Sequence, residues 1–148
     1  MRFPLVDRIE RVEPNRTPAG WKNVAMSEDY LEWHFPGRPI VPGVLVLEAC
    51  VQLAGWLEAA SSGFGRWFLA DHVVSARYYG FVLPGDRLDL RIERVDATGP
   101  DRRAFRGEAS VGGERRASLE FEGLSVDAAR LEDPAKLEAF YRVLLGSS

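Results

Sequence analysis

The sequence predicts an α+β domain in which one antiparallel sheet curls around a single long helix. Residues 42–61 form an apolar run of helical length with almost no polar face, which is typical of a helix buried on most sides. Four later segments instead alternate apolar and polar residues and are separated by turn signals, as half-buried strands are. A buried helix accompanied by several strands requires a sheet that wraps around it.

Length, composition and charge favour one ordinary globular domain, residues 1–148, with 46% hydrophobic residues. The net charge of −3 and the absence of a Lys/Arg-rich tract argue against a nucleic-acid partner. The single cysteine, Cys50, excludes an internal disulfide and a cysteine metal cage, and its apolar neighbours favour a core position. There is no signal-peptide pattern, and the apolar tract 40–57 is interrupted and short for a membrane span. We therefore expect a cytoplasmic protein with no membrane partner.

The order of elements follows from local patterns. Strands are expected at 5–13, 21–26, 66–82, 86–97, 102–111 and 114–126. Residues 27–33 predict one helical turn capped by Ser27. The apolar set of the fourth strand slips near Val95, which indicates a bulge there.

An additional helix is expected at the C-terminus, over residues 131–145. Asp133 is a suitable N-cap, and Pro134 suits the first helical position. One apolar stripe follows at helical spacing: Leu137, Phe140, Tyr141 and Leu144. This helix should pack through that stripe.

The candidate chemistry lies in HFPGRPIVPGVLVLEACVQLAGW, residues 34–56. Glu48 and Gln52 are the only polar side chains between Gly43 and Leu57, and their spacing places them on one helix face. An apolar setting favours the neutral form of a carboxyl, which is then a usable general acid. His34, held by a proline-rich loop, is the natural base near neutral pH. Free N–H groups where the helix begins at Gly43 can hold a carbonyl oxygen that gains negative charge.

The same residues also permit a purely structural interpretation. His34 could be an ordinary surface residue, and Glu48 could simply pair with Arg38 or Arg77. Four aromatic residues lie near the end of the helix and could line a pocket for an acyl or aryl chain, although core packing is favoured for them: Trp56, Phe64, Trp67 and Phe68. The residue pattern by itself leaves these alternatives open.

HFPGRPIVPGVLVLEACVQLAG closely resembles the active-site segment of the 3-hydroxyacyl-acyl-carrier-protein dehydratases, the FabZ/FabA family of the hotdog fold. That pattern is His-Phe-Pro-Gly-x-Pro, two residues, Pro-Gly-Val-Leu, then a carboxylate, Ala and Gln, and every element is present. SARYYGFVLPGDRLDL, LVDRIERVEP and KNVAMSEDYLEWHFPG add to the likeness, which covers about residues 5–125. The C-terminal helix lies beyond this core.

The resemblance implies dehydration of a (3R)-3-hydroxyacyl thioester on acyl carrier protein to the trans-2-enoyl thioester, in fatty-acid or related polyketide or aryl polyene synthesis. His34 would remove the C2 proton, and Glu48 would protonate the leaving hydroxyl. The backbone N–H of Gly43, together with that of Val44, would bind the thioester oxygen, and Gln52 would orient Glu48. It also implies a homodimer or an assembly of dimers whose site takes the histidine from one subunit and the carboxylate from the other, with no metal and no cofactor.

Two departures from the family pattern bear on partners and specificity. Tyr79 and Gly80 follow the Ala-Arg-Tyr triplet where the family often has basic residues, which affects the carrier-protein docking face. The additional C-terminal helix could cover the sheet, cap the acyl tunnel or mediate assembly, with plain packing favoured. Alternative functions are a hotdog thioesterase or hydratase that uses coenzyme A, and a non-catalytic acyl-binding subunit.

Overall fold

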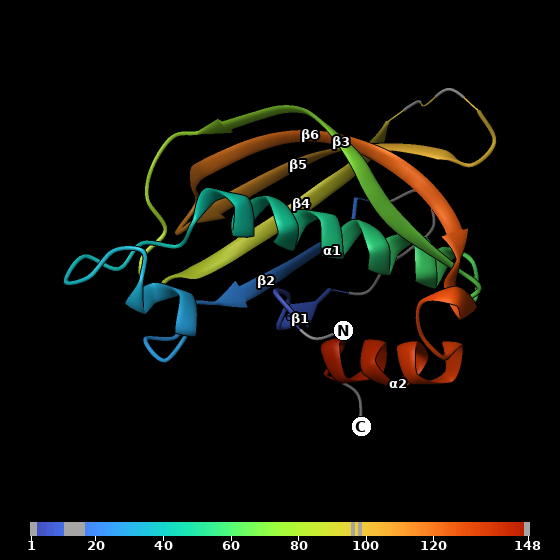
Figure 1. Cartoon of the computed structure of the whole chain (residues 1–148), viewed down its shortest axis with the longest axis horizontal. Helices are drawn as coiled ribbons and strands as arrows, with labels where there is room; N and C mark the ends of the chain where they lie inside the picture. The colour runs from blue at the N-terminus through green and yellow to red at the C-terminus, as the bar shows by residue number, and fades with distance from the viewer. Residues whose placement is uncertain (1–2, 11–16, 96, 98, 147–148) are drawn as a thin grey trace.

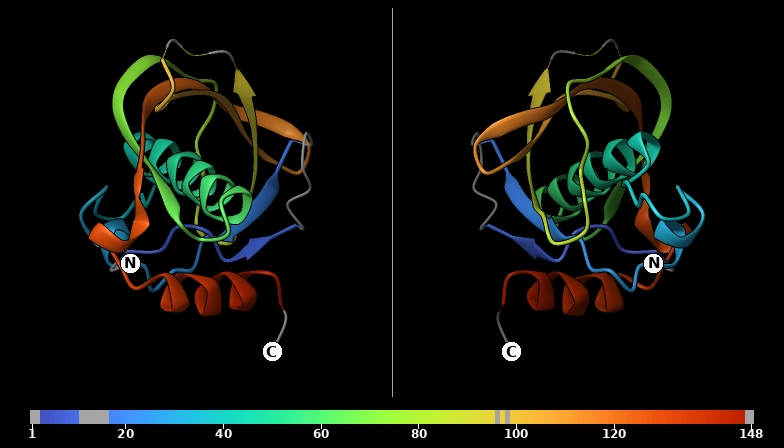
Figure 2. Two further views of the ribbon diagram at one scale, coloured as in Figure 1. Left: turned by 90° about the vertical axis from the view of Figure 1, so that its right-hand side faces the viewer. Right: turned by 90° about the vertical axis from the view of Figure 1, so that its left-hand side faces the viewer.

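A computed structural model describes residues 3–10, 17–95, 97 and 99–146. Within them, six strands form one antiparallel sheet in the order β1-β2-β4-β5-β6-β3, which curls around α1 (Figures 1 and 2). The elements are β1 Arg8–Ile9, β2 Ala19–Asn23, η1 Asp29–Glu32, α1 Gly43–Ser61, β3 Arg66–Tyr78, β4 Arg87–Val95, β5 Arg102–Val111, β6 Glu114–Asp127, η2 Ala128–Arg130 and α2 Pro134–Leu144. The predicted α+β architecture is confirmed.

Helix α1 occupies the concave side of the sheet and supplies much of the core. Pro42 is its N-cap residue, and Leu53, Ala54 and Trp56 are almost fully buried. Cys50 is buried too, and this raises the pKa of its thiol to about 12, so the predicted core position is confirmed. By length and composition α1 could also cross a membrane, but 56% of that stretch is buried within the protein.

Strand β3 is irregular, although one continuous strand was predicted over residues 66–82. Its register with β6 shifts between Ala70 and His72 and again between Val73 and Ser75. Gly123 of β6 permits the first irregularity, because a Cβ there would lie 1.9 Å from the carbonyl oxygen of Leu69. The bulge predicted near Val95 is wrong, since β4 pairs with β5 without a shift.

Several predicted boundaries also change. The first strand covers only Arg8–Ile9 of the predicted 5–13, of which residues 11–13 lie outside the described part of the chain, and β2 begins at Ala19. The N-cap of η1 is Glu28, not Ser27, and it makes no side-chain capping bond. β3 ends at Tyr78, four residues before the predicted end at 82, although the N–H of Tyr79 still donates to the carbonyl oxygen of Arg116 in β6 at 2.8 Å.

The predicted C-terminal helix is present as α2 and lies along the lower side of the molecule in Figure 1, beside β1. The carboxylate of Asp133 accepts a hydrogen bond from the N–H of Ala135, as expected of an N-cap. The buried stripe is Leu137, Tyr141 and Leu144. A guanidinium nitrogen of Arg8 donates to the carbonyl oxygen of Val143 at 3.2 Å and ties the helix to β1.

Candidate active site

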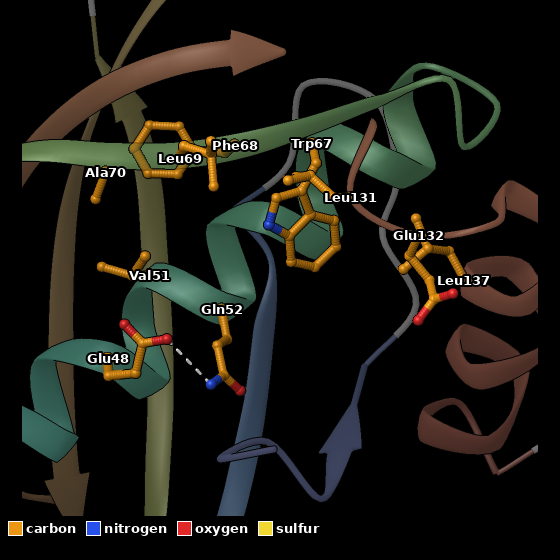
Figure 3. Close-up of a pocket in the computed structure, with 10 residues that line it drawn as sticks. All are labelled: Glu48, Val51, Gln52, Trp67, Phe68, Leu69, Ala70, Leu131, Glu132 and Leu137. Carbon is orange, nitrogen blue, oxygen red and sulfur yellow. Dashed lines mark hydrogen bonds between the residues drawn. The ribbon is translucent and has the colours of Figure 1, made fainter. Parts of the chain in front are cut away.

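The first half of α1 presents Glu48 and Gln52 on one face, as the spacing predicts (Figure 3). The Gln52 amide nitrogen donates to Glu48 Oε1 at 3.2 Å and to the carbonyl oxygen of Phe3 at 2.9 Å. Its amide oxygen accepts the N–H of Leu5 at 2.8 Å. Gln52 is buried, and both ends of its amide are satisfied. It therefore links Glu48 to the N-terminal segment and holds that segment against α1.

Glu48 itself differs from expectation, because its side chain is exposed in the chain rather than buried. It borders a cavity of about 390 Å³ between α1, β3 and the start of α2. Within the described residues Glu48 forms no ion pair with Arg38 or Arg77, so that structural alternative does not apply within one chain. The sequence could not reveal this exposure, since it depends on how much of the helix face the sheet covers.

His34 lies in the loop ahead of α1 and is half-buried. Its Nδ1 is 2.8 Å from the carbonyl oxygen of Ile40, whose own N–H donates to the carbonyl oxygen of His34 at 2.8 Å. A carbonyl can only accept, so Nδ1 must carry the proton, and Nε2 keeps its lone pair in the neutral ring. Phe35 and Arg38 exchange backbone hydrogen bonds in the tight turn between them. The loop therefore holds the His34 ring in one orientation, with Nδ1 bound to Ile40.

The beginning of α1 is shaped by Tyr78 of β3. A Cβ at Gly43 would lie 2.8 Å from the Tyr78 ring, and the Tyr78 hydroxyl donates to the Gly43 carbonyl oxygen at 2.7 Å. The space above Gly43, which the sequence suggested for a ligand, is thus taken partly by a ring of the same chain. The first N–H groups of the helix, those of Gly43 and Val44, have no acceptor within α1. The Val44 side chain is 65% exposed.

In the described part of the chain, His34 and Glu48 border different cavities. His34 borders a separate cavity of about 320 Å³, together with Gly43 and Tyr78. The chain therefore brings together Glu48 with Gln52, and His34 with the start of α1, but it does not bring the two candidate catalytic groups into one site.

The strand beside these cavities has an open edge. β3 is the last strand of the sheet, so one row of its backbone groups lacks a neighbouring strand among the described residues. Large apolar side chains on it and just beyond it are exposed: Leu69, Val73, Val74, Tyr78, Tyr79 and Phe81. An apolar, unpaired edge of this kind is typical of a contact surface.

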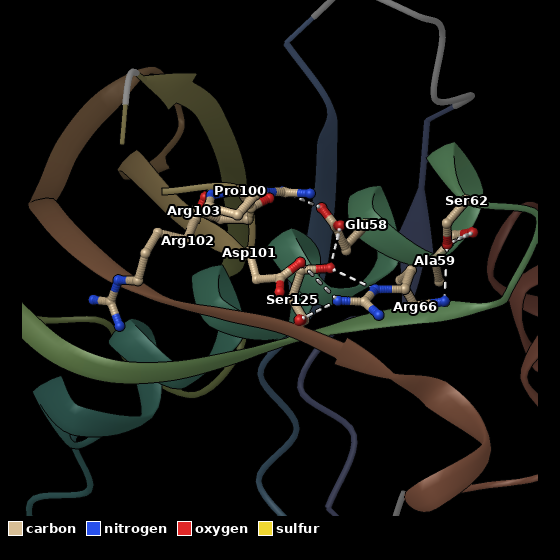
Figure 4. A network of polar contacts seen from close by, with 9 residues as sticks. All are labelled: Glu58, Ala59, Ser62, Arg66, Pro100, Asp101, Arg102, Arg103 and Ser125. Atoms are coloured by element: carbon tan, nitrogen blue, oxygen red, sulfur yellow. Dashed lines mark hydrogen bonds and ion pairs between the residues drawn. The ribbon is translucent and has the colours of Figure 1, made fainter. Parts of the chain in front are cut away.

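A second carboxylate of α1, Glu58, was not predicted from the sequence to have a special role (Figure 4). Glu58 is only 5% exposed, accepts the Ser125 hydroxyl at 2.6 Å and pairs with Arg103 at 3.3 Å. Arg66 binds Ser125 and pairs with Asp101, which extends the network. Elsewhere in the described part of the chain, no three His, Cys, Asp or Glu side chains gather as metal ligands. No sequence signal separated Glu58 from an ordinary helix-end residue.

Comparisons with solved structures confirm the hotdog fold. The dehydratase heterocomplex ApeI:P from Xenorhabdus doucetiae matches with a TM-score of 0.62 and 16% identity, covering 82% of this chain and 98% of that chain. The fluoroacetyl-CoA thioesterase FlK matches with a TM-score of 0.65 and 13% identity, covering 88% and 98%. At these identities the likeness concerns the fold alone.

Relatives found by sequence share a higher identity with this chain than those solved structures do. A 3-hydroxyacyl-[acyl-carrier-protein] dehydratase FabZ of Clostridium acetobutylicum is 39% identical over 122 residues, covering 80% of this chain and 86% of that protein. A FabZ of Symbiobacterium thermophilum is 39% identical over 138 residues, covering 90% and 94%. The model of the FabA-like domain matches residues 1–120, which include every candidate site residue and end before α2. The chain belongs to the FabA-like domain family.

Proposed function

We propose that the protein is a dehydratase that converts a (3R)-3-hydroxyacyl thioester on acyl carrier protein to the trans-2-enoyl thioester, in fatty-acid or related biosynthesis in the cytoplasm. The observation that carries the proposal is the fixed tautomer of His34, whose Nδ1 is held by Ile40 while Nε2 is left as a base. The FabZ relatives, similar over most of the chain, support the same reaction.

In the proposed reaction, Nε2 of His34 takes the proton from C2 of the acyl chain. The electron pair of that C–H bond forms the C2=C3 double bond, the C3–O bond breaks, and Glu48 supplies the proton with which the hydroxyl leaves as water. The N–H groups of Gly43 and Val44 stabilise the negative charge on the thioester oxygen. Gln52 keeps the Glu48 carboxyl in position through their 3.2 Å contact.

We infer that the complete site forms between two copies of the chain. His34 and Glu48 border separate cavities, and the apolar edge of β3 between them is uncovered. Pairing of two β3 edges would bury this surface and bring His34 of one protomer to Glu48 of the other. A homodimer is then the smallest active unit.

Mixing two inactive variants tests the shared site. His34→Ala and Glu48→Gln, each nearly inactive alone, should regain about a quarter of wild-type activity when their subunits exchange at random, because half the dimers then carry one intact site of two. Mixed dimers that stay inactive, while each variant remains folded, would place both residues of a site in one chain.

The activity itself is tested by following enoyl formation from 3-hydroxyacyl thioesters on carrier protein and on coenzyme A. The wild type should dehydrate the carrier-protein substrate, and His34→Ala should lower kcat by about a thousandfold. Release of free thiol, measured in parallel, separates this reaction from thioester hydrolysis. A wild type that binds acyl thioesters but makes no enoyl product is not a dehydratase.

A further inference from the structure

The cavity that begins at Glu48 ends against residues outside the part matched by the FabA-like domain (Figure 3). It follows α1 and β3 from Glu48 and Val51 to Trp67, and its far wall includes Leu131, Glu132 and Leu137. The last three residues lie in the segment between η2 and α2 and in α2 itself. The C-terminal extension therefore contributes directly to a cavity that the candidate catalytic carboxylate borders.

Trp67 is the largest side chain of that wall, and several contacts fix its position. A Cβ at Gly55 would lie 2.3 Å from its indole, so the ring rests directly on the α1 backbone. It meets Trp56 edge to face, with ring centroids 5.0 Å apart. A ring wedged between a helix backbone and a fully buried tryptophan has little freedom to move aside.

Helix α2 packs against Trp56 and so supports the contact between Trp56 and Trp67. Trp56 stacks on Tyr141 with centroids 5.9 Å apart and contacts Phe140 at 5.6 Å. Leu137, which borders the cavity, belongs to the same buried stripe of α2 as Tyr141. The apolar face of α2 thus packs against Trp56, and Trp56 packs against Trp67. Through Leu137, α2 also forms part of the cavity wall.

We propose that Trp67, Leu131 and Leu137 form the closed end of the acyl cavity, and that the C-terminal extension makes the enzyme selective for short acyl chains. This inference rests on the proposed dehydratase function. A short chain fits between Glu48 and Trp67 without disturbing the wall of the cavity. A long chain must displace the Trp67 indole from Gly55 and Trp56, and Glu132 places a carboxylate at the end where an apolar chain terminus would lie.

The test compares kcat/KM for 3-hydroxyacyl thioesters from about four to about sixteen carbons. The wild-type value should fall steeply with length. Trp67→Ala and Leu131→Ala should raise the ratio of long-chain to short-chain kcat/KM by at least about tenfold. If Trp67→Ala fails to fold, Trp67→Leu replaces it, and thermal melting checks each variant.

Matched controls come from outside the cavity. Leu124→Ala removes a side chain that is 39% exposed on β6, compared with 51% for Leu131, and Trp21→Ala removes a half-buried tryptophan of β2. Neither residue borders the cavity, so neither change should alter the length profile. A flat wild-type profile, or cavity variants that shift the profile no more than these controls, overturns the inference.

Binding of saturated acyl thioesters, which cannot be dehydrated, separates the two proposals. If no variant forms enoyl product but Trp67→Ala extends the length of chain that binds, the closed end stands and the dehydratase proposal fails. If the wild type dehydrates its substrates but binding and turnover are insensitive to both Trp67→Ala and Leu131→Ala, the dehydratase proposal stands and the closed end fails.

Discussion

Helix α1 carries two glutamates with opposite surroundings. Glu48, in its first half, is exposed, borders a cavity and has Gln52 as its hydrogen-bond partner. Glu58, near its end, is buried and bound by both Arg103 and Ser125. A carboxylate whose acceptor positions are filled by fixed donors stabilises a fold, whereas one that is held on one side and open on the other can exchange a proton with a substrate. The same residue type on one helix is thus expected to serve chemistry at one position and stability at the other.

The largest effect on activity is expected for Glu48→Gln, which tests whether Glu48 serves chemistry rather than stability. The amide cannot supply the proton that the leaving hydroxyl needs, so kcat should fall by about a thousandfold, or about 4 kcal/mol. The melting temperature should change little, because the side chain is exposed. Steady-state kinetics and thermal melting measure both, and retained activity would remove Glu48 from the mechanism.

The reciprocal change is Glu58→Ala. It leaves Arg103 and the Ser125 hydroxyl without their buried partner and should lower the free energy of unfolding by about 3 kcal/mol. Activity per folded molecule should stay close to that of the wild type. Urea unfolding together with an active-site titration measures the two effects. Lost activity in a folded, stable protein would mean that the two glutamates are not functionally distinct.

Gln52→Leu tests a residue for which we expect both a catalytic and a structural effect, because Gln52 contacts Glu48 and also the N-terminal backbone. The apolar side chain cannot bond the backbone of Phe3 and Leu5, so the free energy of unfolding should fall by about 2 kcal/mol. A misplaced Glu48 should also lower kcat by roughly tenfold to a hundredfold. Gln52→Glu provides the polar control. An unchanged kcat with lowered stability would limit Gln52 to anchoring the N-terminal segment.

The smallest effect is expected for Tyr78→Phe. The ring against Gly43 is kept, and only the 2.7 Å hydrogen bond to the Gly43 carbonyl oxygen is lost. The free energy of unfolding should fall by about 1 kcal/mol, and kcat/KM should fall by no more than about threefold. A loss of activity as large as that of Glu48→Gln would mean that the hydroxyl takes part in the chemistry.

Much of the fold was predictable from local patterns. The strands at 102–111 and 114–126 appear as β5 and β6, and the Asp133 cap and the apolar stripe locate α2. The predicted contact between Gln52 and Glu48 is confirmed, because helical geometry alone places residues four apart within reach. The errors include the Ser27 cap and the bounds of the first two strands, and also the bulge in β4 and the end of β3, which depend on pairing with strands distant in sequence.

Local sequence patterns are sufficient to predict the α1 helix, the alternating strands and the His34 to Gln52 motif, because each depends on residues close together in the chain. Tertiary packing is what leaves Glu48 exposed and buries Glu58. It also places His34 and Glu48 at separate cavities. Only the tertiary structure showed that the segment after η2 and helix α2 both border the cavity at Glu48, through Leu131 and Leu137 respectively. The physical reason is that exposure, charge pairing and cavity shape are set by which distant segments pack together, and a local periodicity does not encode that choice.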